Sequence, residues 1–201
     1  MNQKNRIGHV QLISSALKPE EYPNWLTSAG KRVPEIVLVG RSNVGKSSLI
    51  NHLCDQPSLA KTSTTPGKTE RLHFFLVDRR WFLVDLPGYG FAAKAKAVQK
   101  EWSAHIEHYL NTRHGLTALL LLIDSRQLLQ PQDDTILKWA DHRTLPVIVV
   151  FTKADKLSKQ AQRNFFQVDK GSLNRYPSLL YSTRSGKCRE RLLSILRKIW
   201  G

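Results

Sequence analysis

Several features that mark other protein classes are scarce or absent in this chain of 201 residues. It has two cysteines, Cys54 and Cys188, without the spacing of a metal site, and so few thiols are typical of a reducing compartment. Its seven histidines also lack metal spacing. No apolar run approaches the roughly 20 residues that span a bilayer, and residues 1–9 lack a signal-peptide core. We therefore expect a cytoplasmic protein with no membrane partner.

Acidic residues are also few. The chain has 16 Asp and Glu against 31 Lys and Arg, which gives a net charge of +15. This excess is larger than solubility requires and favours a polyanionic partner such as nucleic acid, although scattered solubility charges are the alternative. We find no linker or internal repeat. We expect a monomer in which an N-terminal extension, residues 1–34, packs on one globular domain, residues 35–201.

A phosphate-binding motif is the first chemical signal. Residues 40–47 read Gly-Arg-Ser-Asn-Val-Gly-Lys-Ser, which fits G-x-x-x-x-G-K-[ST], and they follow an apolar run at 35–39 that predicts a buried strand. In such a loop, backbone N–H groups surround the phosphates, Lys46 reaches the β- and γ-phosphates and the Ser47 hydroxyl ligates Mg²⁺. Residues 47–53 are then expected to form a helix that points at the phosphates.

Apolar and amphipathic segments alternate along the rest of the chain. We predict an α/β fold with a doubly wound, mostly parallel six-stranded sheet flanked by helices. The predicted strands are 35–39, 72–77, 81–84, 117–123, 146–151 and 178–181. The predicted helices after 47–53 are 94–111, 133–140, 158–169 and 186–200. Residues 10–13 are a candidate edge strand, and residues 59–69 a polar loop. Trp102 and Tyr109 follow helical spacing and are assigned to the core rather than to base stacking.

Two further motifs each close a predicted strand. In Asp-Leu-Pro-Gly at 85–88, the carboxylate can hold Mg²⁺ through water and the glycine N–H can sense a γ-phosphate. In Thr-Lys-Ala-Asp at 152–155, a carboxylate can accept both N1–H and N2–H₂ of guanine, which adenine does not offer. All three motifs would meet at the carboxyl ends of the strands, where open α/β sheets bind ligands.

Longer stretches around these motifs carry a family resemblance. They are Gly-Arg-Ser-Asn-Val-Gly-Lys-Ser-Ser-Leu at 40–49, Pro-Gly-Lys-Thr at 66–69, Asp-Leu-Pro-Gly-Tyr-Gly at 85–90 and Lys-Ala-Asp-Lys-Leu at 153–157. Over about residues 8–199 the sequence resembles the translation-factor-related GTPases and, within them, the bacterial EngB family, also called YihA or YsxC. The resemblance implies a GTPase that hydrolyses GTP to GDP and phosphate, acts in assembly of the large ribosomal subunit and is needed for normal cell division and septation.

The resemblance also implies a complete site. Catalytic roles fall to Lys46, Thr69 and Gly88. Phosphate contacts fall to Gly40, Arg41, Ser42, Asn43, Val44, Gly45, Lys46 and Ser47. The first switch would contain Gly67, Lys68, Thr69, Glu70 and Arg71, and the second Asp85, Leu86, Pro87 and Gly88. Guanine would lie against Thr152, Lys153, Ala154 and Asp155, with Tyr181, Ser182 and Thr183 as the last loop. Ser47 and Thr69 would ligate Mg²⁺.

Three positions shape the expected mechanism. Tyr89 stands where many GTPases have a water-orienting glutamine, so we predict slow intrinsic turnover that a partner or cation stimulates. Thr152 stands where many have asparagine, so base selectivity depends more on Asp155. Asn43 is either a K⁺ ligand, as in related GTPases, or a plain loop residue.

The partner is left open between two classes. Basic residues around the loops, namely Lys61, Lys68, Arg71, Lys94 and Lys96, could contact ribosomal RNA of the large subunit or its precursor, or they could be solvated. The alternative is a nucleotide-gated protein-interaction factor of the division machinery. An ATP-dependent nucleotide kinase is a third reading, but it leaves Asp155 without a role.

Overall fold

The protein folds around one mixed sheet. The computed structural model describes residues 7–61, 71–89, 96–127, 129–167 and 171–200. In these residues seven strands pair in the order β1-β3-β4-β2-β5-β6-β7. The strands are β1 (Val10–Ala16), β2 (Glu35–Gly40), β3 (Leu72–Val77), β4 (Trp81–Asp85), β5 (Leu116–Asp124), β6 (Val147–Thr152) and β7 (Ser178–Leu180). The α/β class and the mostly parallel sheet are thus confirmed.

Strand direction follows the sequence pattern. The pairs from β4 through β2, β5 and β6 to β7 are parallel, whereas β1, β3 and β4 pair antiparallel. β2 and β6 are buried along their whole length, as expected for parallel strands covered on both faces. Residues 78–80 form the tight turn between β3 and β4.

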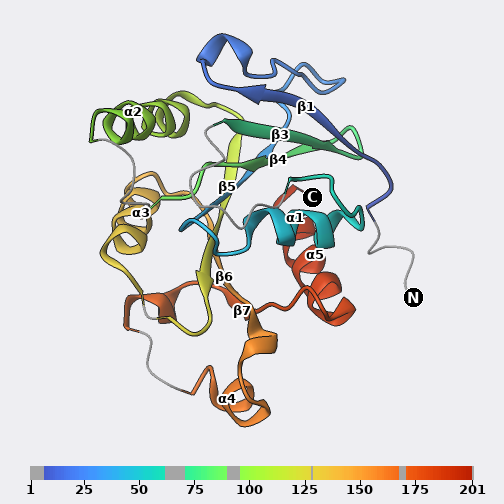
Figure 1. Cartoon of the computed structure of the whole chain (residues 1–201). Helices are drawn as coiled ribbons and strands as arrows, with labels where there is room; N and C mark the ends of the chain where they lie inside the picture. The colour runs from blue at the N-terminus through green and yellow to red at the C-terminus, as the bar shows by residue number, and fades with distance from the viewer. Residues whose placement is uncertain (1–6, 62–70, 90–95, 128, 168–170, 201) are drawn as a thin grey trace.

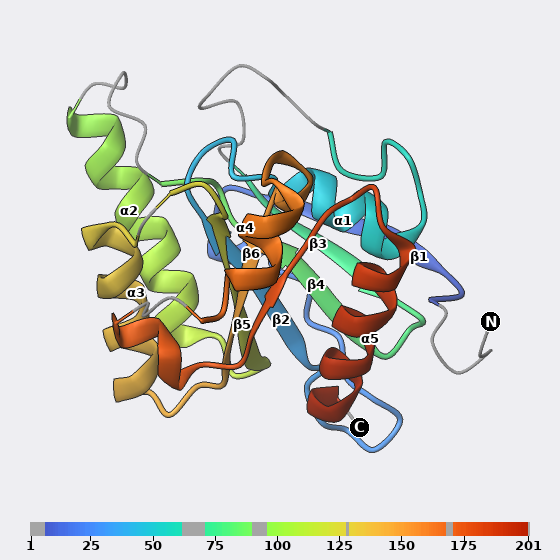
Figure 2. The same cartoon turned by 90° about the horizontal axis from the view of Figure 1, so that it is seen from below.

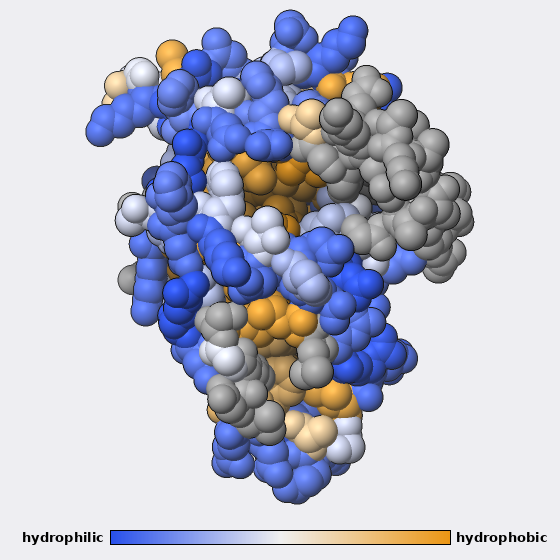
Figure 3. Space-filling view, turned by 90° about the vertical axis from the view of Figure 1, so that its left-hand side faces the viewer, coloured by the Kyte–Doolittle hydropathy of each residue, from blue (hydrophilic) through white to orange (hydrophobic). Residues whose placement is uncertain are grey.

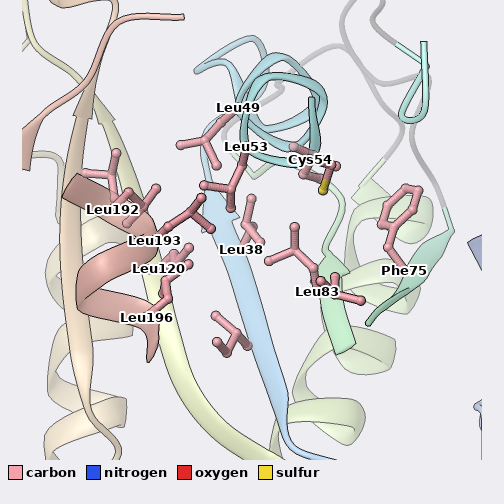
Figure 4. Close-up of a cluster of buried hydrophobic side chains, with 14 of the residues drawn as sticks. Leu38, Leu49, Leu53, Cys54, Phe75, Leu83, Leu120, Leu192, Leu193 and Leu196 are labelled. Atoms are coloured by element: carbon pink, nitrogen blue, oxygen red, sulfur yellow. The ribbon is translucent and has the colours of Figure 1, made fainter. Parts of the chain in front are cut away.

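Helices cover both faces of the sheet. α1 (Lys46–Cys54) and α5 (Gly186–Trp200) lie on one face, and α2 (Lys96–Thr112) and α3 (Pro131–His142) lie on the other (Figures 1 and 2). Each face has its own apolar core. Figure 4 shows the first core, where Leu49 and Leu53 of α1 and Leu193 of α5 point at Leu38 of β2.

On the opposite face, polar contacts of a buried tyrosine and an arginine join α2 and the residue after it to β2. Tyr109 of α2 is fully buried and donates a hydrogen bond to Glu35 Oε2 at 2.6 Å, which confirms its core assignment. Arg113 pairs with the same carboxylate at 2.6 Å. The side chain of Trp102 lies outside the described residues. On the side that carries α2 and α3, hydrophilic residues surround hollows in which hydrophobic residues are visible (Figure 3).

Two predictions about elements need correction. The sheet has seven strands rather than six, because residues 10–16 pair along β3 as an edge strand whose exposed positions weaken the apolar alternation. α4 is only Lys159–Asn164, not 158–169. Ser158 caps this helix by accepting a hydrogen bond from the Ala161 amide, and after it ends the Phe165 ring packs on Phe151 with centroids 4.8 Å apart.

The N-terminal segment takes part in the same sheet. β1 lies within the predicted extension 1–34 and pairs with β3 of the predicted domain 35–201. A division of the chain at residue 34 stays a prediction. Among the described residues, no helix is both long and apolar enough to cross a bilayer.

Candidate functional site

The site lies where β2 ends and α1 begins. β2 stands between β4 and β5 in the sheet, so the strand order reverses beside it and its carboxyl end opens into a crevice. Residues 41–45 form the loop that connects β2 to the N-terminus of α1. Gly45 caps the helix with φ 110°, a conformation that side chains disfavour. Backbone N–H groups of the first helical turn therefore point into the crevice, as anion binding requires.

Two opposite charges are buried under this loop. Lys46 is 9% exposed, and its Nζ donates to the Gly40 carbonyl at 3.4 Å. Burial lowers the pKa of Lys46, partly offset by Asp85, and burial raises the pKa of Asp85 to about 6, partly offset by Lys46. Both shifts disfavour the charged forms. A phosphate beside Lys46 and a cation beside Asp85 would restore both charges.

The carboxylate of Asp85 keeps acceptor capacity that a metal's ligand shell could use. Its Oδ2 accepts a long hydrogen bond of 3.5 Å from Ser47 Oγ, while the buried Oδ1 has no hydrogen-bond partner among the described residues. A hydroxyl and an unpartnered carboxylate oxygen are the hard ligands that Mg²⁺ prefers. The residues present therefore fit Mg²⁺, which Ser47 would ligate and Asp85 would hold through water.

The loop after Asp85 packs tightly on the phosphate loop. A side chain at Gly88 would bring its Cβ to 2.7 Å from the backbone of Ser42 and 3.0 Å from Lys46 Nζ, so only glycine fits. The Ser42 amide donates to the Tyr89 carbonyl at 2.9 Å, and the Ser42 hydroxyl to the Gly88 carbonyl at 3.3 Å. Leu86 and Pro87, between Asp85 and Gly88, are buried. The first two motifs thus meet as expected.

Thr152, at the end of β6, and Lys153, which follows it, hydrogen-bond to the backbone of the phosphate loop. Thr152 Oγ1 donates to the Val44 carbonyl at 2.6 Å, and Lys153 Nζ donates to the Asn43 carbonyl at 2.8 Å. Thr152 is 3% exposed, so its hydroxyl serves the loop rather than a base. The hydroxyl thus links the third motif to the first, although it cannot supply an asparagine's amide.

Asp155 and Ser182 form the far end of the site. Asp155 lies in the turn Ala154–Lys156 that follows β6, and its Oδ1 accepts a hydrogen bond from Ser182 Oγ at 3.0 Å. The Ala154 amide donates to the Tyr181 carbonyl at 3.1 Å, which fastens the two loops together. The carboxylate is thereby oriented, as recognition of guanine N1–H and N2–H₂ needs.

Other predicted site residues have different surroundings. The Tyr181 ring is buried and its hydroxyl is hydrogen-bonded to His52, so only its backbone reaches the site. Thr183 is exposed. Arg71 donates to the Ser15 carbonyl at 3.2 Å, at the β1 edge. Gly67, Lys68, Thr69 and Glu70 lie outside the described residues.

Sequence reasoning missed two carboxylates beside the phosphate loop. Asp124 ends β5 and pairs with Lys153 Nζ at 3.0 Å. Arg126, followed by Lys153, holds the pKa of Asp124 well below its usual range. Asp133, in the first turn of α3, accepts a hydrogen bond from the Tyr89 hydroxyl. An acidic residue that closes an apolar strand, the signal that identified Asp85, is also present at Asp124.

A polar cavity of about 170 Å³ separates these carboxylates from the phosphate loop. Arg41 and Gln127 both line the cavity, and Arg41 Nη1 donates a hydrogen bond to Gln127 Oε1 at 2.9 Å. Its lining combines residues 41–44 of the loop with Asp124, Arg126, Gln127, Gln130 and Asp133, as well as Leu122, Ile123 and Lys153.

Comparison with known proteins agrees with this geometry. The profile of a family described as 50S ribosome-binding GTPase matches residues 35–153. A probable GTP-binding protein EngB of Thermoanaerobacter pseudethanolicus is 40% identical over 195 residues, which cover 96% of this chain and 98% of that protein. The chain belongs to the EngB family of GTP-binding proteins. Like its family, it is a P-loop GTPase, and the resemblance seen in the sequence is confirmed.

Solved structures share the fold. The crystal structure of a probable GTP-binding protein EngB has a TM-score of 0.54 at 22% identity, covering 83% of this chain and 98% of that one. The crystal structure of Era in complex with MgGDPNP and a fragment of 16S ribosomal RNA has a TM-score of 0.63 at 22% identity, covering 82% of this chain and 56% of that one. The sheet and its helices are therefore those of GTPase domains.

Proposed function

We propose that this EngB-family GTPase is a nucleotide-dependent switch in assembly of the large ribosomal subunit, acting in the cytoplasm and needed for normal cell division and septation. The observation that carries the proposal is the family match, because the family is described as 50S ribosome-binding. The charge of +15 supports an RNA-rich partner. Era, whose structure holds ribosomal RNA, has the same fold.

The switch depends on how GTP and Mg²⁺ are held. Mg²⁺ supplies charge neutralisation between the phosphates when it is bound. In our proposal Ser47 and Thr69 ligate it, Lys46 neutralises the phosphates and the Gly88 amide contacts the γ-phosphate. The segment that contains Thr69 then orders in the GTP state and relaxes after hydrolysis. A Thr69→Ala protein should bind GDP normally but lose most GTPase activity, and normal hydrolysis by this variant would contradict the role of Thr69.

Co-sedimentation with purified large ribosomal subunits tests the partner. The protein is mixed with subunits in the presence of a non-hydrolysable GTP analogue, GDP or no nucleotide, over a series of salt concentrations. We expect pelleting that depends on the analogue and weakens steeply with salt, since phosphate contacts release counterions. Asp155→Asn protein serves as the control that should not respond to the analogue.

Failure of that experiment has a definite meaning. If the protein fails to pellet with subunits in every nucleotide state tested, the ribosomal role is refuted. That result would favour the nucleotide-gated protein-interaction factor of the division machinery. Among the basic loop residues, Lys68 and Lys94 lie outside the described part of the chain, and Arg71 is held at β1.

A further inference from the structure

Positive charge is concentrated near the C-terminus. Residues 153–201 contain twelve Lys and Arg against three Asp and Glu, a net charge of +9 out of the +15 of the whole chain. This segment contains α4, β7 and α5, together with the turn Ala154–Lys156 that carries Asp155. A quarter of the chain thus carries more than half of its charge excess, which scattered solubility charges do not explain.

On α5 these cations form a line. Lys187, Arg191 and Lys198 are spaced by four and seven residues, so they lie on one side of the helix, and all three are exposed. We call these three residues the α5 basic stripe. At 1.5 Å per residue it is roughly 16 Å long. Arg184, which is also exposed, extends the stripe toward the nucleotide site. Its Nε lies 3.7 Å from Oδ2 of Asp155.

The cations of the stripe are not engaged in ion pairs with the part of the chain that the structure describes. Among the described residues, none of its three cations forms an ion pair, whereas Lys138 on α3 pairs with Asp134 at 2.8 Å. Glu190 is the single carboxylate on α5. Two other cations of the helix are turned inward: Arg197 is half-buried, and Arg189 donates to the Leu53 carbonyl at 3.0 Å. The helix thus separates cations that serve the core from cations that face solvent.

The shape of the helix excludes an apolar or membrane-inserting role for this side. Leu192, Leu193 and Leu196 on the opposite side are buried against the sheet (Figure 4). An interfacial membrane helix needs its apolar face free to enter the lipid. What remains exposed on α5 is a hydrophilic, cationic strip, and α4 also presents the exposed cations Lys159 and Arg163.

We propose that the α5 basic stripe binds the phosphate backbone of RNA. This inference rests on the proposed ribosomal function and adds the surface that carries it. Because the backbone of α5 is already ordered, its exposed cations can neutralise phosphates without the cost of ordering a flexible segment. Since the contacts go to phosphates, the stripe positions the protein on folded RNA and contributes little sequence preference.

The test compares two variants with the same change in charge. Lys187→Gln, Arg191→Gln and Lys198→Gln are combined in the stripe variant, because glutamine preserves helix propensity. The control variant combines Lys31→Gln, Arg79→Gln and Arg80→Gln, three exposed cations that lie outside α5, in the segments that precede β2 and β4. Both proteins should keep wild-type GDP affinity and thermal stability.

Binding to protein-free large-subunit ribosomal RNA is then measured from about 50 to about 200 mM salt. The stripe variant should bind about tenfold or more weakly at intermediate salt, and its log–log salt slope should be smaller by about 2–3 than that of the wild type, since each lost phosphate contact removes about 0.7–0.9. The control variant should stay within about twofold of the wild type.

Each other outcome overturns the inference. If both variants lose affinity equally, RNA senses only net charge and the stripe is not a site. If the stripe variant binds RNA normally while wild-type protein pellets with large subunits, the ribosomal function stands and another surface carries it. If wild-type protein binds neither RNA nor subunits, the proposed function fails first. Stripe-dependent binding to phosphatidylglycerol vesicles without RNA binding would assign the surface to a membrane.

Discussion

The hydroxyl of Tyr89 donates a hydrogen bond to Oδ1 of Asp133, which joins the residue after the Asp-x-x-Gly motif to the first turn of α3. The same carboxylate caps α3, because its Oδ2 accepts a hydrogen bond from the Gln130 amide at 2.8 Å. The Tyr89 carbonyl in turn accepts a hydrogen bond from the Ser42 amide at 2.9 Å. Tyr89 is therefore anchored at both ends, and it positions the loop rather than orienting water.

Tyr89→Phe removes one of these anchors. The buried Oδ1 of Asp133 would lose its partner, so we expect the free energy of unfolding to fall by about 1–3 kcal/mol. Loosening of the neighbouring Gly88 should lower kcat for GTP by about tenfold or more with little change in KM. Tyr176→Phe, which breaks an exposed tyrosine–aspartate hydrogen bond to Asp141, is the matched control and should leave kcat unchanged. A wild-type kcat for Tyr89→Phe would contradict the positioning role.

Asp155→Asn should change which base is bound. An amide replaces one acceptor oxygen with a donor, which then faces the N2–H₂ donor of guanine, whereas the 2-oxo group of xanthine can accept from it. We expect GDP affinity to fall by about a hundredfold or more and xanthosine diphosphate to become the preferred ligand. Ser182→Ala, which releases the orienting hydrogen bond to Asp155 and the one that Ser182 Oγ accepts from the Arg184 amide but keeps the carboxylate, should cost much less. Calorimetry with both nucleotides checks the prediction, and unchanged preference for GDP would refute it.

Thr152→Val tests the support of the phosphate loop. Valine has the same shape but cannot donate to the Val44 carbonyl, which Thr152 contacts at 2.6 Å. We expect a loss of stability of about 1–3 kcal/mol and weaker GDP binding. The control is Thr117→Val, which removes a comparable hydrogen bond to Gly115 at the opposite end of the sheet. If the two variants bind GDP equally well, the hydroxyl of Thr152 does not support the site.

Asp124→Asn tests the link between β5 and Lys153. The variant keeps the shape of the side chain but loses the charge that holds Lys153 Nζ at 3.0 Å, so we expect weaker GDP binding by about tenfold. Because the folded-state pKa of Asp124 is depressed, its charge stabilises the protein above the unfolded pKa of about 3.9, and this stabilisation is lost as pH falls below that value. Thermal melts should therefore differ between wild type and variant at neutral pH and converge in acid.

A K⁺ ion beside Asn43 is tested through turnover. Asn43 has φ 61° and lines the cavity beside the phosphate loop, so Asn43→Gly removes the amide without straining the backbone. We expect GTP turnover to be several-fold faster in K⁺ than in Na⁺ for the wild type and equal in both salts for Asn43→Gly. Equal turnover of the wild type in the two salts would assign Asn43 to a plain loop role.

Elements with strong periodicity could be predicted from the sequence. β2, β5 and β6 are continuous apolar runs, and α5 has a clear apolar side, so their boundaries fall within about two residues of those expected. β1 was harder because an edge strand buries only part of one face. α4 was overestimated because the helix ends at Asn164, although its C-cap Phe165 keeps helical backbone angles and packs on Phe151.

The site was predictable where a motif fixes the backbone. Gly45 and Gly88 occupy positions that only glycine tolerates, and the spacing around them is visible in the sequence. The partnership of Tyr89 with Asp133 was not predictable, because it joins residues 44 positions apart through a helix cap with no fixed spacing. The exposure of the α5 stripe likewise needed the buried side of the helix to be known.

The order of the strands has a consequence for the newly made chain. The phosphate loop follows β2, early in the chain, but its support Thr152 ends β6 and Lys153 follows it. Ser182, which orients Asp155, comes after the last strand. A growing polypeptide emerges from its amino end, so the pocket remains incomplete until about nine tenths of the chain has been synthesised. Guanine recognition by this protein therefore depends on residues made late, and a product that ends before Asp155 lacks the carboxylate that would accept the N–H groups of the base.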